Sequence, residues 1–210
     1  MALITRLVAT GDRSKKVKVY LDGKYAFSLE ADLALEAGLR TSQELSQSKI
    51  DRLDHANHLK KALAAAGCLL SFRPRSEHEL RQKLTQRGFD AVIISESIEY
   101  LKEHKQVDDA AFARYWAENR TAFNPRSQRL LQLELRQKGV TADVAEETSS
   151  EIDDEAGAYA AGAKRVSRLE MSDYEDFRHR LGEYLRRRGF GYDVINRSVK
   201  RLWDEHAHKE

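Results

Sequence analysis

The sequence predicts a mainly α-helical protein made of tandem three-helix repeats, preceded by a small N-terminal module with a β-hairpin. Three observations support this prediction. Only 2 of the 210 residues are proline, where ordinary usage of about 5% would give roughly ten, and proline ends helices. Charged residues reach 33% and hydrophobic residues 41%, which favours long helices around a buried core over disorder. The third observation is an internal repeat of about fifty residues.

Residues 1–55 form the predicted N-terminal module. The β-rich runs Val17–Leu21 and Tyr25–Ser28 flank an Asp22-Gly23 pair, the signature of a hairpin closed by a type I′ turn. Leu3–Ala9 is expected to add a third strand. Two short helical segments complete this three-stranded module, with apolar residues in the groups Leu33, Leu35, Leu39 and Leu45, Ile50, Leu53.

The rest of the chain repeats. The segment Phe72–Ser76 (Phe-Arg-Pro-Arg-Ser) recurs 51 residues later as Phe123–Ser127 (Phe-Asn-Pro-Arg-Ser). Leucines and a glycine follow at matching positions in three copies: Leu80, Leu84, Gly88; Leu131, Leu135, Gly139; and Leu181, Leu185, Gly189. Such a period in helical sequence indicates an array of helical units. The predicted repeats span residues 56–106, 107–152 and 153–210.

Each repeat divides into three helices. In the first repeat, a helix near residues 57–72 ends before Pro74, which disfavours helix at the residue before it. Ser76 and Glu79 have the spacing of a capping box for the second helix, which stops at Gly88 as its C′ residue. A third helix presents Ile94, Ile98 and Leu101 on one face.

Pairs of aspartates open the other two repeats. Asp108-Asp109 precedes a helix with Phe112, Ala113 and Trp116 on one face, and Asp153-Asp154 stands at the matching place in the third repeat. We interpret both pairs as N-caps that also favour the helix dipole, rather than as metal ligands or acid–base pairs. The third repeat lacks the proline, and Ser172 is the expected cap of its second helix.

No catalytic constellation is evident. The glycine- and alanine-rich stretch Gly157–Lys164 has its lysine one place too late for a phosphate loop and follows no strand, so we interpret it as small residues for close helix packing. His55 and His58 have no third ligand nearby in sequence. Cys68 is expected to be a buried small hydrophobe. We therefore expect no enzymatic activity, no metal and no cofactor.

Membrane and export signals are also missing. The longest apolar stretch, Ala62–Phe72, has 11 residues and is interrupted by Gly67 and Ser71, too short to cross a bilayer. Residues 1–10 lack the apolar run of a signal peptide. A single cysteine excludes an intrachain disulfide and fits a reducing compartment. We expect a cytoplasmic protein with no membrane partner.

The formal net charge of +2 hides opposed local runs. Residues 143–155 are strongly acidic and contain no basic residue. The region from the proline to the glycine is basic in each repeat, which suits phosphates or acidic protein strips along an elongated partner, although a solvated helix face is the usual meaning of such runs. The candidate partner- or nucleic-acid-binding residues are Arg73, Arg75, Arg81, Lys83, Arg87, Arg126, Arg129, Arg136, Lys138, Arg178, Arg186, Arg187 and Arg188.

These motifs resemble those of the RecX family, bacterial regulators of the RecA recombinase. The first repeat shows Arg73-x-Arg75-Ser76-x-x-Glu79-Leu80. The second opens with Asp108-Asp109-x-x-Phe112-Ala113-x-x-Trp116-x-x-x-Arg120 and continues to Lys138-Gly139-Val140. The third closes with Arg187-Arg188-Gly189-Phe190-x-Tyr192. The resemblance covers residues 57–206, and the hairpin module resembles an extension found in longer members.

The resemblance implies an elongated, curved, all-helical body that lies in the groove of the RecA–single-stranded DNA filament. It further implies restraint of the ATPase, strand-exchange and co-protease activities of RecA in DNA repair and the SOS response. Inhibition is the default for the family, and some relatives modulate RecA positively. Whether binding caps the filament ends or lines the groove stays open, and we expect a monomer.

Two other functions are compatible with the residues alone. Three-helix units with a basic middle helix can act as helix-turn-helix-like modules that bind DNA without RecA. An enzyme with an unrecognised site is the third possibility, which the lack of a convergent polar set disfavours.

Overall fold

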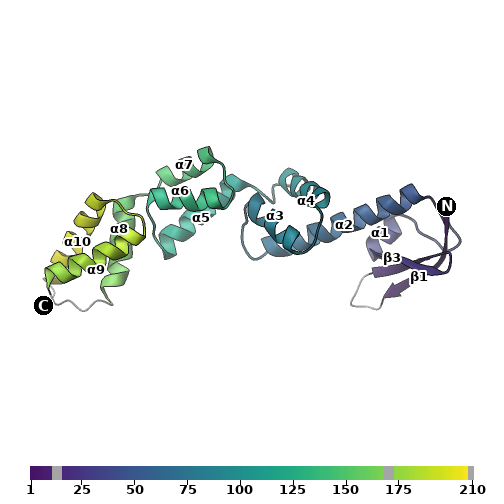
Figure 1. The fold of residues 1–210 in the computed structure, drawn as a ribbon, viewed down its shortest axis with the longest axis horizontal. Coiled ribbons are helices and arrows are strands. Elements are labelled where there is room, and N and C mark those ends of the chain that lie inside the picture. The colour runs from purple at the N-terminus through teal and green to yellow at the C-terminus, as the bar shows by residue number, and fades with distance from the viewer. Residues whose placement is uncertain (11–15, 168–172, 208–210) are drawn as a thin grey trace. The chain divides into compact units, whose positions relative to one another are not determined.

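The computed structural model describes residues 1–10, 16–167 and 173–207, and these contain four strands and ten helices (Figure 1). The chain forms two compact units. One consists of Met1–Arg73 and Leu80–Gln106, and the other of Pro74–Glu79 and Val107–Glu210. Both the mainly helical fold class and the three tandem three-helix repeats are confirmed.

The N-terminal module contains an antiparallel sheet with strand order β3-β2-β1-β4. Its strands are β1 (Ala2–Thr10), β2 (Lys16–Leu21), β3 (Lys24–Glu30) and β4 (Glu44–Leu45). The hairpin and the third strand are as predicted, and Asp22 and Gly23 have φ of 49° and 81°, as a type I′ turn requires. The assignment of Leu45 to a helix is wrong. Leu45 pairs with Ala2 in β4 and is fully buried in the module's core, and this pairing depends on a strand distant in sequence.

Helix α2 (Gln47–Leu70) joins the module to the first repeat, while α1 (Ala31–Glu36) packs on the sheet. Ser46 caps α2 by accepting from the backbone N–H of Lys49, so the helix predicted from residue 57 starts earlier and runs through the boundary predicted after residue 55. Buried Asn57 fixes α2 to β3. Its Oδ1 accepts from the N–H of Glu30 at 3.1 Å, and its Nδ2 donates to the carbonyl of Ser28 at 3.0 Å.

The first repeat comprises α2, α3 (Glu77–Gln86) and α4 (Ala91–Glu103). The predicted cap is confirmed, because Ser76 Oγ accepts from the N–H of Glu79 at 3.1 Å. Gly88 ends the second helix with a φ of 84°, also as predicted. The prediction of a buried Cys68 is wrong, since the residue is exposed. The buried stripe of α2 runs through Ala62, Ala66 and Leu69, and position 68 points away from it.

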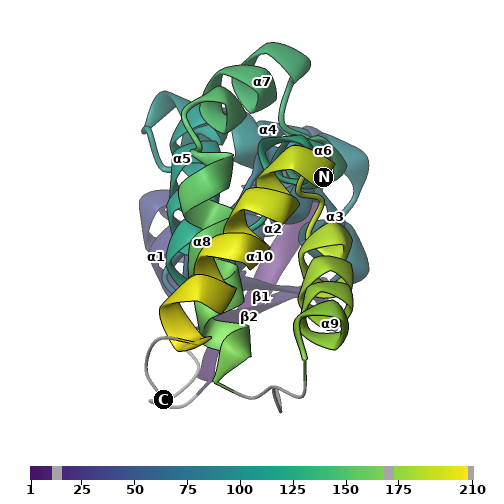
Figure 2. The same cartoon turned by 90° about the vertical axis from the view of Figure 1, so that its left-hand side faces the viewer.

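The second and third repeats lie in the second unit, and Figure 2 shows the helices of the third side by side. Their helices are α5 (Asp109–Phe123), α6 (Gln128–Gln137), α7 (Ala142–Ser150), α8 (Asp154–Val166), α9 (Tyr174–Arg187) and α10 (Tyr192–Ala207). The landmark leucines of α6 and α9 are buried, as the repeat predicts. The predicted cap Ser172 lies outside the described residues; Asp173 caps α9 by accepting from the N–H of Asp176.

The small residues of α8 allow close packing, as predicted. Gly157 and Gly162 are buried. A Cβ atom at Gly162 would lie 2.5 Å from Cδ1 of Leu202, so any side chain there would require Leu202 to shift. The glycine- and alanine-rich stretch is therefore a helix-packing surface rather than a phosphate loop.

The second and third repeats interlock at their helix ends. The backbone N–H of Ser127 donates to the carbonyl of Arg188 at 3.1 Å. The N–H of Gln128 donates to Oδ1 of Asp154 at 2.7 Å, and its side-chain amide donates to the carbonyl of Ile152 at 2.6 Å. The first N–H groups of a helix have no partner within it, so the third repeat supplies the partners that α6 lacks.

The same arrangement recurs where the start of α3 meets the second repeat within the second unit. Ser76 Oγ donates to the carbonyl of Lys138 at 2.6 Å, and the N–H of Glu77 donates to Oδ1 of Asp109 at 2.8 Å. The two members of each aspartate pair thus act differently. Asp108 and Asp153 cap the helices they open, as predicted, whereas Asp109 and Asp154 also bind the middle helix of the preceding repeat.

Glycine is required where these helix ends meet. Gly139 and Gly189 have φ of 84° and 87°. A Cβ atom at Gly139 would lie 2.3 Å from Cβ of His78, and one at Gly189 would lie 2.6 Å from Oγ of Ser127. Gly139 and Gly189 therefore each end their own helix and also make room for the start of the middle helix in the preceding repeat.

Alanine at Gly139 or Gly189 should destabilise the protein more than alanine at Gly88. The left-handed backbone imposes a similar penalty at all three sites, roughly 1–2 kcal/mol. A Cβ at Gly88 meets nothing within 4 Å, whereas the other two positions are overpacked by an added methyl group, a further penalty of about 1–3 kcal/mol. Urea unfolding followed by circular dichroism measures the difference. Equal losses at the three positions would contradict the interlocking described above.

The acid pair also predicts a pH dependence. Burial raises the pKa of Asp154 and outweighs the hydrogen bond from Gln128, and the charge of Asp153 raises it further. The folded state therefore keeps this proton at a higher pH than the unfolded chain, so the stability the carboxyl group contributes is lost as the pH rises from about 3.9 through the raised folded-state pKa. The Asp154→Asn variant keeps the acceptor oxygen but cannot ionise. As the pH rises across this window, its free energy of unfolding should therefore increase relative to that of the unsubstituted chain. A constant difference between the two proteins would refute the assignment.

Candidate binding surface

Several predicted binding residues hold the repeats together. Lys138 Nζ forms an ion pair with Glu79 at 2.6 Å. The guanidinium of Arg188 donates to Oδ1 of Asn124 and, at 2.9 Å, to the carbonyl of Pro125. Both residues precede the glycine of their repeat. The basic residue at this position therefore has a structural reason to recur, independent of any partner.

A carboxylate gathers three donors in the second repeat. Glu134, whose side chain is 12% exposed, accepts from Trp116 Nε1 at 3.0 Å and from Arg120 Nε at 2.8 Å, and its other oxygen forms an ion pair with Arg126 Nη1 at 2.5 Å. Lys138 Nζ lies 4.1 Å from the centre of the Trp116 ring, and the guanidinium of Arg120 lies 4.6 Å from it. These contacts fix the side chain of Arg126, so it serves the repeat's own structure.

Next to this cluster, α6 presents an apolar and basic face. Leu133 is 53% exposed, and it lines two adjoining cavities with Leu130. One cavity, of about 410 Å³, is bounded by the Trp116 cluster, and the other, of about 450 Å³, is flanked by Arg129 and Arg136. We call Arg129, Leu130, Leu133 and Arg136 the α6 face.

The two arginines of the α6 face are exposed. In the described part of the chain, no hydrogen bond or ion pair involves either guanidinium group. Their positive charges are therefore not neutralised by other described residues, and the two side chains lie on either side of exposed Leu133 in the sequence of α6. Such a surface can bind an anionic partner without first breaking an internal contact.

The last turn of α9 adds two exposed arginines. Arg186 and Arg187 lie 3.0 Å and 3.9 Å from carboxylate oxygens of Glu183, and the hydrogen bond from Arg186 lowers the pKa of that carboxyl group. Arg178 makes a similar exposed pair with Glu175 at 2.9 Å, which raises the pKa of the Arg178 guanidinium. Ion pairs in solvent are weak, so a partner's phosphate or carboxylate can replace these.

The predicted residues of the first repeat lie on other elements. Arg81 donates to Ser95 Oγ at 3.1 Å, Lys83 donates to Gln86 at 3.1 Å, and exposed Arg87 donates to the carbonyl of Ala65 at 3.3 Å. Arg73 and Arg75 are half-buried, and each interacts with another residue of the chain. Four of these residues, Arg73, Arg81, Lys83 and Arg87, belong to the first compact unit, whereas Arg75 and the basic residues of the other two repeats belong to the second.

The sequence could have revealed the apolar part of the α6 face. Leu131 and Leu135 mark the buried stripe of α6, so Leu133 must lie on another side of that helix. A leucine off the buried stripe and between two arginines was the available signal. The role of Glu134 was not accessible, because it depends on how α5 packs on α6.

The described residues contain no group of three or more potential metal ligands. His55 instead contacts Glu96 at 2.7 Å. None of the described helices is long and apolar enough to cross a bilayer.

Three family models match the chain: the first, second and third three-helix domains of RecX match residues 62–101, 108–148 and 153–199. A regulatory protein RecX of Clostridium botulinum is 30% identical over 205 residues, covering 95% of this chain and 96% of the relative. That of Chlorobium limicola is 32% identical over 149 residues, covering 70% of this chain and 94% of the relative.

Solved structures share the fold. A crystal structure of regulatory protein RecX superposes with a TM-score of 0.68 at 21% identity, covering 93% of this chain and 98% of the other. The structure of RecX from Lactobacillus salivarius gives 0.59 at 23% identity, covering 70% and 97%. The resemblance noted in the motifs thus extends over all three repeats, and the chain belongs to the RecX family of regulatory proteins.

Proposed function

We propose that this protein binds the groove of the RecA–single-stranded DNA filament and restrains the ATPase, strand-exchange and co-protease activities of RecA. It acts in the cytoplasm as a monomer, within DNA repair and SOS control. Membership of the RecX family supports the regulatory role, and the two arginines of the α6 face, which are exposed and have no ion pair with any described residue, supply a surface for an anionic filament.

The second and third repeats carry the main contact. Their interlocked helices belong to one compact unit, and the end of α9 meets α6 where Gly189 approaches Leu130. Arg129 and Arg136 lie on α6, and Arg186 and Arg187 lie in the last turn of α9, whose end adjoins the start of α6. Their charges bind DNA phosphates or acidic loops, while Leu133 adds apolar contact to a protein surface.

Charge reversal on the α6 face should weaken the effect on RecA. The Arg129→Glu/Arg136→Glu variant is expected to need at least about tenfold more protein to inhibit DNA-stimulated ATP hydrolysis by RecA, because two attractive contacts become repulsive. The Arg186→Glu/Arg187→Glu variant should behave in the same way. Arg188 is left unchanged, since its guanidinium holds the junction of the second and third repeats. The readout is steady-state ATPase of RecA on single-stranded DNA.

The matched control is Lys24→Glu/Lys200→Glu, which changes the charge equally at exposed positions elsewhere and should shift inhibition by no more than about twofold. If the arginines contact DNA, each lost phosphate contact reduces the slope of log affinity against log salt by about 0.7. Unchanged RecA ATPase at saturating amounts of the unsubstituted chain would overturn the proposal. Tight duplex binding without RecA, with no effect on the filament, would favour a helix-turn-helix-like DNA-binding module instead.

A further inference from the structure

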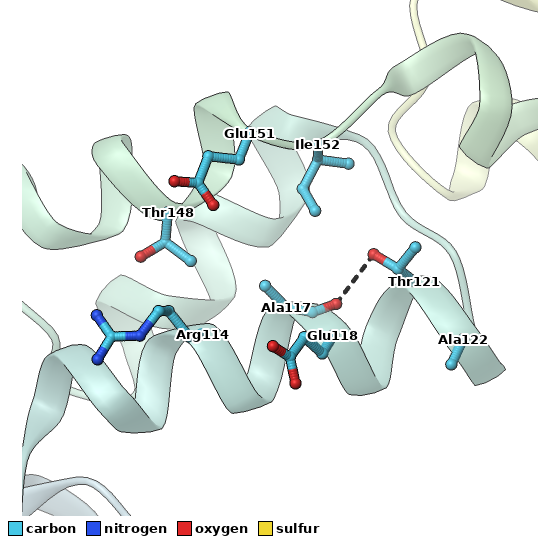
Figure 3. A pocket seen from close by; sticks show the side chains of 8 residues that line it. All are labelled: Arg114, Ala117, Glu118, Thr121, Ala122, Thr148, Glu151 and Ile152. Carbon is cyan, nitrogen blue, oxygen red and sulfur yellow. Dashed lines mark hydrogen bonds between the residues drawn. The ribbon is translucent and has the colours of Figure 1, made fainter.

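A third cavity lies between α5 and α7 of the second repeat, outside the α6 face. It has a volume of about 390 Å³, within the range of about 300–1,000 Å³ common for ligand sites. Figure 3 shows Thr148, Glu151 and Ile152, from α7 and the residues just after it, across the cavity from Arg114, Ala117 and Glu118 of α5. The floor is apolar and buried at Ala117.

The rim carries unneutralised negative charge. Glu118 and Glu151 are exposed, and neither carboxylate has an ion pair in the part of the chain that the structure describes. Arg114 stands at one end of the cavity, and Lys164 Nζ donates to the carbonyl of Ala122 at 2.9 Å, so the rim has two carboxylates beside two cations. Helix α7 adds exposed Asp143, Glu146 and Glu147, and no lysine or arginine occurs between Lys138 and Lys164. The field at this cavity is therefore negative.

One threonine hydroxyl is accessible from the cavity. Thr148 is 7% exposed and lines the cavity, yet no hydrogen bond involves its Oγ1 among the described residues. By contrast, Thr121 at the rim donates to the carbonyl of Ala117 at 3.0 Å, the dashed line in Figure 3. None of the described residues has a fully buried side-chain polar atom without a hydrogen-bond partner, so the Thr148 hydroxyl keeps accessible surface at the cavity and is available to a polar atom of a ligand.

We propose that this cavity is a docking site for a basic segment of a partner protein. The segment inserts one apolar side chain between α5 and α7, against Ala117 and Ile152. A backbone group of the segment bonds the Thr148 hydroxyl, and flanking arginine or lysine residues pair with Glu118 and Glu151. The proposal does not rest on filament binding, because it uses a different face and the opposite charge.

The test is an NMR titration of the full chain with three synthetic peptides. The probes are acetyl-Ser-Arg-Leu-Arg-Ser-amide, the same peptide with glutamate for arginine, and the same peptide with serine for leucine. The basic leucine peptide should give saturable shifts of the methyl groups of Ala117, Thr148 and Ile152, with an affinity about tenfold above those of the other two. Glu118→Gln/Glu151→Gln and the isosteric Thr148→Val should each weaken it several-fold, and Ala122→Phe at the exposed rim should block it.

The matched control is Glu146→Gln/Glu147→Gln, which removes the same charge from α7 at positions that do not line the cavity. Equal weakening by both double variants would show diffuse attraction and overturn the site, as would equal binding of the acidic peptide, saturable shifts only elsewhere, or no shift at all. Amide spectra of each variant without peptide establish that it is folded. Sedimentation of the unsubstituted chain tests whether a second copy of the chain occupies the cavity instead. Self-association that Glu118→Gln/Glu151→Gln abolishes would overturn the proposal of a partner protein in favour of a second copy.

Discussion

The structure depends on one constraint: the first backbone N–H groups of a helix have no partner in that helix. In this chain the following repeat satisfies them. Asp109 and Asp154 accept from the first N–H groups of α3 and α6, and the carbonyls of Lys138 and Arg188 accept from the serines that cap these helices. These contacts bring the end of the middle helix of the following repeat so close that the residue after it has no room for a Cβ atom. Glycine therefore occupies positions 139 and 189.

This constraint divides the basic residues by role. Lys138 and Arg188 hold helix ends together, and Arg126 is fixed by Glu134. Among the described residues, Arg129 and Arg136 form no hydrogen bond or ion pair, and Arg186 and Arg187 form only exposed ion pairs, so their charge is available to a partner. Because the helix ends are locked, the α6 face is presented by a compact unit rather than by single flexible helices. The acidic cavity between α5 and α7 offers the same unit a second surface of opposite charge.

Local chemistry made much of the fold predictable. The hairpin turn, the Ser76 cap and the buried leucines of each middle helix all follow from short patterns in the sequence. The two-residue strand around Leu45 does not, because it depends on pairing with β1, and Cys68 was misplaced because an alanine-rich helix shows no clear apolar face. For the binding surface, the sequence located the basic residues. It could not separate Arg188 from Arg187, since that difference arises only where α9 packs against the loop at Asn124 and Pro125.

Hydrogen exchange at two matched amides tests the interlocking most directly. Gln128 and Ala142 are the first residues of α6 and α7. The N–H of Gln128 donates to Asp154, whereas that of Ala142 has no partner among the described residues. After correction for intrinsic rates, exchange at Gln128 should be at least about a hundredfold slower than at Ala142, and Asp154→Ala should remove that protection. Equal protection of the two amides would contradict the account.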